Sequence, residues 1–208
     1  MNKDAPKSLK DFALKAERLS QIHDQHVAPL TIFVEELRYE AGPGAEIPYF
    51  DPWDGGAEAE VLLLLEAPGP KAVASSFISR NNPDETAKNI FELTAAAGID
   101  RKQTVLWNVV PWYIGSGTKI RAATPKDLES GLRPLPRLLS FLPKLRAVVL
   151  LGKKAEKAAA LIRVSHQGIR IFHCGHPSPL YVNNAPGNRE KILQTLVEVK
   201  TYMQGKSG

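Results

Sequence analysis

The sequence predicts an α/β fold with three layers, in which helices cover both faces of a central, mostly parallel four-stranded sheet. From residue 60 onward, short apolar segments of strand length alternate with longer segments of helical periodicity. Such alternation is typical of parallel strands joined by right-handed crossovers. The apolar run 61–65 ends at an acidic turn with Pro68 and Gly69, as expected of a strand buried on both faces.

The strands and helices of this pattern can be placed along the chain. Strands are predicted over 61–65, 104–110, 147–151 and 169–173. Helices are predicted over 88–97, from Thr124 toward Leu142, over 153–164 and over 188–203.

Local signals mark several helix ends. Gly98 suits the position just past a helix, because glycine adopts a left-handed backbone without strain. Thr124 and Asp127 form a capping-box pattern, with Pro125 at the first helical position. The helix that they open is expected to kink or split at its internal glycine and prolines, Gly131, Pro134 and Pro136.

The N-terminal stretch predicts two amphipathic helices. Apolar residues recur at helical spacing in both, at Leu9, Phe12, Ala16, Leu19 and Ile22, and then at Leu30, Phe33, Val34 and Leu37. The segment 41–44 should end the second helix, and 47–56 is predicted to be a loop. We interpret 1–208 as a single domain with 1–58 as a helical extension packed on it, and we expect 204–208 to be frayed.

Composition excludes several classes of protein. No apolar stretch approaches the about 20 residues of a membrane span, and no secretory signal is present at the start, so residence in the cytoplasm is expected. Cys174 is the only cysteine, which rules out an internal disulfide and a cysteine-ligated iron–sulfur cluster. The five histidines lack the spacing of a zinc site, and we expect no metal. The net charge of +5 permits a nucleic-acid partner but does not demand one.

Chemically useful side chains follow the predicted strands. Glu66 follows the first, Asn108 lies late in the second, Gly152 follows the third and His176 comes after the fourth. Since the carboxyl ends of parallel strands open onto one edge of the sheet, we expect these residues to surround a single cleft. A carboxylate, an amide and an imidazole there would suit acid–base chemistry and ligand recognition.

Two motifs at this edge resemble the signature motifs of the uracil-DNA glycosylase superfamily. They are Glu66-Ala67-Pro68-Gly69 and His176-Pro177-Ser178-Pro179-Leu180. The run 107–111 and Gly152 lie where that superfamily places a base-reading asparagine and its third strand. The resemblance covers the chain from about residue 60 onward and implies the fold of those enzymes, which cleave the bond between a base and its sugar in DNA.

The resemblance implies catalytic roles for Glu66 and His176. Glu66 would stabilise positive charge on the sugar or polarise the attacking water, and His176 would donate a hydrogen bond to the departing base. Simpler readings are also open: Glu66 as a solvated turn residue or a helix cap, and His176 as a loop histidine bonded to backbone. The other histidines are interpreted as structural.

Further residues would bind the base and the DNA. Asn108 would read uracil, because its amide both donates and accepts, although it could instead tie two loops together. Phe77 would stack on the extruded base, and Ala67 and Gly69 would lie beside it. Contacts to DNA are assigned to Pro68, Gly152, Ser178 and Leu180, the last as a wedge into the vacated stack, or else as a leucine packed under its own loop.

The chain departs from the family pattern at three points. The branch with a Glu-Ala-Pro-Gly motif usually has four cysteines that hold an iron–sulfur cluster, so this chain resembles a cluster-free branch. Leu65 stands where a glycine usually begins the first motif. Gly69 stands where the enzymes most specific for uracil have a tyrosine that rejects thymine, so exclusion of thymine would need another residue.

The sequence therefore predicts a monofunctional glycosylase that flips uracil, or another deaminated base, out of single- or double-stranded DNA and leaves an abasic site. We expect a monomer that needs neither a metal nor a nucleotide cofactor and has no membrane partner. One alternative is a DNA- or lesion-binding member of the same fold with little or no turnover. Another is an unrelated α/β enzyme acting on a small nucleotide, which no glycine-rich phosphate loop supports.

Overall fold

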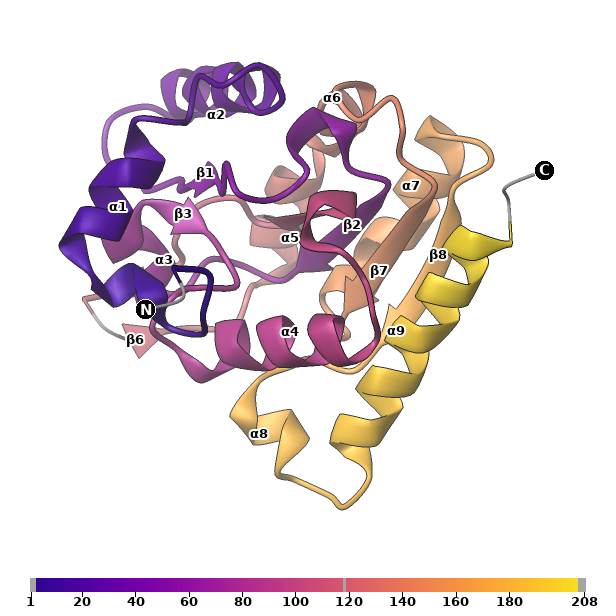
Figure 1. The fold of residues 1–208 in the computed structure, drawn as a ribbon. Coiled ribbons are helices and arrows are strands. Elements are labelled where there is room, and N and C mark those ends of the chain that lie inside the picture. The colour runs from indigo at the N-terminus through magenta and orange to yellow at the C-terminus, as the bar shows by residue number, and fades with distance from the viewer. Residues whose placement is uncertain (1–2, 118, 206–208) are drawn as a thin grey trace.

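The computed structural model describes residues 3–117 and 119–205 (Figure 1). The expected fraying of 204–208 therefore falls largely outside the described residues. No helix in this part of the chain is both long and apolar enough to cross a membrane.

The central sheet has four parallel strands in the order β4-β2-β7-β8. They are β2 (Val61–Leu65), β4 (Thr104–Asn108), β7 (Ala147–Leu151) and β8 (Arg170–Cys174). The predicted three-layer α/β fold is confirmed, and two strands have the predicted bounds. The strand predicted over 104–110 ends at Asn108, and the fourth is displaced by one residue. The two central strands, β2 and β7, are buried along their whole length.

Helices cover both faces of this sheet (Figure 1). In front of it lie α4 (Glu85–Ala96) and α9 (Asn188–Gln204), which contact each other. Behind it lie α5 (Pro125–Leu132), α6 (Leu135–Ser140) and α7 (Ala159–Ser165), the last preceded by the 3-10 turn η4 (Ala155–Ala158). The capping box at Thr124 and Asp127 is present, and the predicted split separates α5 from α6 at Pro134.

The N-terminal region differs in part from its prediction. It contains η1 (Ser8–Lys10), α1 (Phe12–Leu19) and α2 (Ala28–Ala41), so the first helix is shorter than its apolar spacing suggests. Phe12 is 82% exposed, and its assignment to an apolar face is therefore wrong. The segment 47–56 is not only loop, since β1 (Tyr49–Phe50) pairs in parallel with β3 (Phe77–Ile78). The 3-10 turn η2 (Gly56–Glu58) ends the N-terminal region. Later in the chain, the short helix α3 (Pro70–Ser75) follows β2, and the 3-10 turn η3 (Arg101–Gln103) precedes β4.

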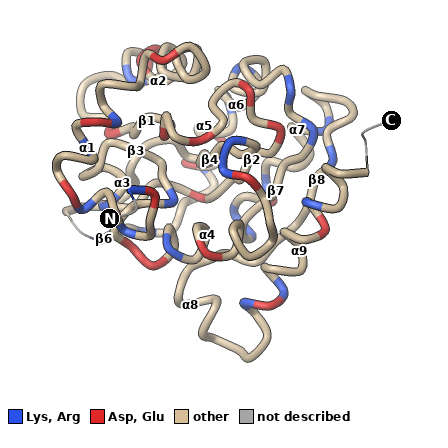
Figure 2. Tube along the Cα trace, in the orientation of Figure 1, with Lys and Arg blue, Asp and Glu red and all other residues tan. Residues whose placement is uncertain are grey.

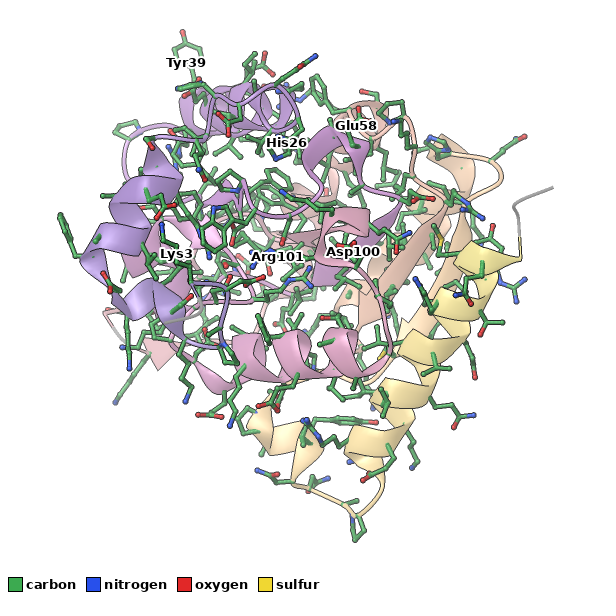
Figure 3. All side chains as sticks on the ribbon, viewed as in Figure 1. Lys3, His26, Tyr39, Glu58, Asp100 and Arg101 are labelled. Carbon is green, nitrogen blue, oxygen red and sulfur yellow. The ribbon has the colours of Figure 1, made fainter. Side chains whose placement is uncertain are left out.

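A buried cluster of charges joins α1 to the sheet. Arg18, which has no exposed surface, forms an ion pair with Asp51 and donates a hydrogen bond to Ser79 at 3.2 Å. Arg101, labelled in Figure 3, contacts Asp51 at 2.7 Å and Asp54 at 2.9 Å. Burial by itself would raise the pKa of Asp51, but Arg101 and Arg18 outweigh it and lower that pKa.

Charged residues elsewhere are dispersed over the chain. Figure 2 shows Lys and Arg distributed over most elements, interspersed with Asp and Glu. The surplus of positive charge is thus not gathered into one run of the sequence.

Candidate active site

The carboxyl ends of β2 and β4 and the loop after β8 meet at a cleft of about 590 Å³. Glu66, Asn108 and His176 all line it. The three residues come from distant parts of the chain. The register of the sheet brings Glu66 close to Asn108, because Leu65, the residue before Glu66, pairs with Asn108. A short hairpin is formed by β5 (Gly115–Ser116) and β6 (Lys119–Ile120). Its last residue, Ile120, also lines the cleft, together with Arg121 and Ala122 that follow it.

Glu66 is half-buried, and a backbone amide fixes its orientation. The Ala123 N–H donates a hydrogen bond to Oε1 of Glu66 at 2.6 Å. Glu66 does not cap the following helix, because α3 has Gly69 at its N-cap position and no side-chain capping bond. The carboxylate is therefore held at the cleft wall with Oε2 engaged by no hydrogen bond from the described residues.

His176 lines the cleft, and a backbone hydrogen bond defines the roles of its two ring nitrogens. Its Nδ1 accepts a hydrogen bond from the Ser178 N–H at 3.1 Å, so in the neutral ring Nε2 bears the proton. Burial lowers the pKa of His176 below its ordinary value, and the charge of Glu66 only partly opposes this. The ring is thus bonded to backbone on one side and, as a neutral group, can donate from the other.

Asn108 ends β4 and is 4% exposed. No hydrogen bond to its side-chain amide is found among the described residues, so it does not tie two loops together there. Both its donor and its acceptor remain available to a ligand in the cleft.

Phe77 does not lie in the cleft, so the expected stacking on a base is wrong for this structure. The side chain has no exposed surface and packs with Leu9 and Ile22. Its neighbour Ile78 lines the cleft instead. Successive side chains of a strand point to opposite faces, so a shift of one residue along the strand decides whether Phe77 or Ile78 faces the cleft.

Gly152 is not among the residues that line the cleft, and a DNA contact is not supported there. It has a φ of +95°, and a Cβ on it would lie 3.0 Å from Cβ of His176. A glycine is required at this position because the backbone passes close beneath the imidazole.

The other residues of the two motifs line the cleft, except Pro177 and Pro179. Ser178 caps the short helix α8 (Pro179–Val182), and Leu180 on that helix is 84% exposed rather than packed under its loop. Gly69 faces open space, since a Cβ there would meet no atom within 4 Å. The other residues of the two motifs that line the cleft are Ala67 and Pro68.

Several residues near the site were not predicted. Asn89 on α4 donates a hydrogen bond to the Pro177 carbonyl at 2.8 Å and accepts one from Arg189 at 3.1 Å, so it holds the loop that bears His176. Ser79 and Asn82 line the cleft after β3. The sequence signal for Ser79 and Asn82 is the mostly polar run 79–84, which follows the apolar pair Phe77–Ile78.

Cys174 is no candidate nucleophile. It is buried at the end of β8, and burial raises the pKa of its thiol to about 12. In the described part of the chain, no group of three or more His, Cys, Asp or Glu residues is placed to hold a metal ion.

Comparison with known proteins identifies the family. The family model of the uracil DNA glycosylase superfamily matches residues 52–198. The crystal structure of wild-type SMUG2 from Pedobacter heparinus is similar in fold, with a TM-score of 0.54, 14% sequence identity, and coverage of 88% of this chain and 87% of that chain. No curated protein sequence matches the chain. Because the family model spans well over half of its length, the chain belongs to the uracil-DNA glycosylase superfamily.

Proposed function

We propose that the protein is a monofunctional DNA glycosylase that hydrolyses the N-glycosidic bond of uracil, and of other deaminated bases that the cleft admits. The observation that supports this most directly is the presence of Glu66, Asn108 and His176 on one cleft of about 590 Å³. A carboxylate, an amide and a neutral imidazole are the groups that such a reaction needs around a single base.

The carboxylate would act on the sugar side of the bond. As the bond between the base and C1′ breaks, the electron pair leaves with the base and positive charge develops on the sugar. Glu66, held through Oε1 by the Ala123 amide, can stabilise that charge and orient a water molecule with its other oxygen. The water oxygen then bonds to C1′, and the proton lost from the water balances the charge of the departing base.

The imidazole would act on the base. A neutral His176, protonated at Nε2, donates a hydrogen bond to the carbonyl oxygen on which negative charge accumulates. Loss of one such donor typically costs about 2.7–4 kcal/mol of barrier. Asn108 would donate to O4 and accept from N3–H, the pair that distinguishes uracil from cytosine.

The rim of the cleft fits an extruded nucleotide. Flipping a base from a duplex costs a few kcal/mol, and an exposed apolar side chain can fill the vacated stack. Leu180 is exposed at this rim, next to Ser178 and its short helix. We propose Leu180 as the wedge, and Ser178 with Pro68 as contacts to the DNA backbone.

We also propose that 1–58 forms one domain with the rest of the chain. Leu9 N–H donates to the Asn81 carbonyl at 3.0 Å, and Arg18 contacts Ser79, a cleft residue. The N-terminal helices would then support one wall of the cleft.

The test is excision from a uracil-containing oligonucleotide followed by hot alkali, which cuts the strand at abasic sites. Wild-type protein should yield the cut strand, while Glu66→Gln and His176→Ala should lower the single-turnover rate at least about a hundredfold with DNA affinity near wild type. Binding without scission would instead identify a lesion-binding member of the family. Activity on a free nucleotide but not on DNA would contradict both.

A further inference from the structure

The loop between β6 and α5 is fixed to the core at two points around Ala123. The Ala123 N–H donates to Oε1 of Glu66, and the Ala123 carbonyl accepts a hydrogen bond from Nζ of Lys154, each at 2.6 Å. Ala123 itself is 2% exposed. One residue of the loop thus lies between a lysine on one side and the carboxylate of the cleft on the other.

Lys154 reaches this loop from the turn that follows β7. It follows β7 immediately before η4, and its side chain is half-buried where it contacts the loop. Hydrogen bonds from an ionised group are roughly twice as strong as neutral ones. The contact can therefore hold the loop even though the hairpin before it is exposed.

A further fixed point lies just beyond, at the start of α5. Arg121 and Thr124 both bond to Asp127, which anchors the loop to the helix but not to the cleft. Ala123 is packed in the buried core, and among the described residues the only hydrogen bond to its carbonyl is the one from Lys154. Loss of the Lys154 bond would leave the Ala123 carbonyl without its hydrogen-bond donor and the position of the amide fixed by packing alone.

We propose that Lys154 is a positioning residue for the reaction: it holds Ala123 so that its amide orients the Glu66 carboxylate. This inference rests on the proposed role of Glu66. Lys154 does not line the cleft and acts only through the loop.

The first test measures the loop directly and needs no enzyme activity. In ¹⁵N-labelled protein, the short bond to a carboxylate should move the Ala123 amide proton downfield, and Glu66→Gln should move it back. Lys154→Met should shift this resonance in the same direction as Glu66→Gln. Lys154→Arg, which keeps a charged donor, should leave the resonance near its wild-type position. Lys153→Met is the matched control, because the neighbouring lysine is exposed and makes no contact to the loop. An unchanged Ala123 resonance in Lys154→Met would overturn the proposal.

The second test is a double-mutant cycle in single-turnover excision. Lys154→Met should slow excision about tenfold, the effect expected of one lost hydrogen bond to a charged group, but should cause no further loss in the Glu66→Gln background. Equal losses in both backgrounds, or weaker DNA binding with a smaller salt dependence, would assign Lys154 to a phosphate contact and overturn the proposal.

The two tests separate the possible failures. If the wild-type protein excises no base, the proposed function fails, and the Ala123 resonance alone decides whether Lys154 positions Glu66. If Lys154→Met does not fold, as judged by thermal denaturation, Lys154→Leu serves in both tests, because it also removes the donor to the Ala123 carbonyl.

Discussion

Gly152 and His176 pack so closely that a Cβ on Gly152 would lie 3.0 Å from Cβ and 3.2 Å from Cδ2 of the histidine. These two residues follow neighbouring strands, β7 and β8, at the edge of the sheet that bears the cleft. The position of the imidazole thus depends on the absence of a side chain at 152.

The first prediction tests this packing. Gly152→Ala should displace His176 and slow single-turnover excision about tenfold or more. The variant should also be less stable, because a non-glycine residue with a left-handed backbone costs about 1–3 kcal/mol of strain. Gly168→Ala is the matched control, since Gly168 has a similar φ of +97° but open space around its Cβ position. Equal loss of excision in both variants would show that strain alone is responsible.

The second prediction concerns the protonation of His176. Burial lowers its pKa, so an NMR titration should place it below the ordinary value of about 6.5. Glu66→Gln removes the charge that opposes this shift and should lower the pKa further. Because the unfolded chain binds this proton more readily, the contribution to stability is present above about pH 6.5 and is lost as the pH falls below it. A pKa above 6.5 in the wild type would contradict a neutral donor.

The third prediction addresses the wedge. Leu180→Ala should reduce excision from duplex DNA more than from single strands, because only a duplex leaves a gap to fill. Val164→Ala is the control, since Val164 is 80% exposed but does not line the cleft. Excision rates on paired single- and double-stranded substrates decide it, and equal losses would argue against a wedge.

The fourth prediction tests the reading of the base. Asn108→Asp replaces an amide donor by a carboxylate oxygen, which repels O4 of uracil while still accepting from N3–H. We expect the preference for uracil over cytosine to fall by about tenfold or more, in line with about 1–3 kcal/mol for an unsatisfied polar group. Single-turnover rates on otherwise identical oligonucleotides measure it. Full discrimination in the variant would remove Asn108 from base recognition.

The fifth prediction concerns the buried charge cluster. Arg18→Met leaves Asp51 buried with one guanidinium fewer and should lower the free energy of unfolding by about 3–5 kcal/mol. Arg133→Met, which breaks an exposed pair with Glu129, should change it by less than about 1 kcal/mol. Urea denaturation of the two variants gives the comparison. A small effect of Arg18→Met would mean that Arg101 suffices for Asp51.

The sequence by itself determined the sheet and the convergence of the three principal residues. Apolar runs of strand length fix β2 and β7 to the residue, and the capping box fixes the start of α5, because these are local patterns. Glu66, Asn108 and His176 then meet because parallel strands end at one edge of a sheet.

Only the tertiary structure decided which neighbours complete the site. Whether Phe77 or Ile78 faces the cleft depends on how a two-residue strand pairs with β1, and periodicity cannot fix that over so short a segment. The same holds for the Ala123 amide, which reaches Glu66 across 57 positions of chain, and for Lys154, which reaches Ala123 across 31. Such contacts arise from the packing of loops against one another, and a backbone amide carries no sequence signal of its partner.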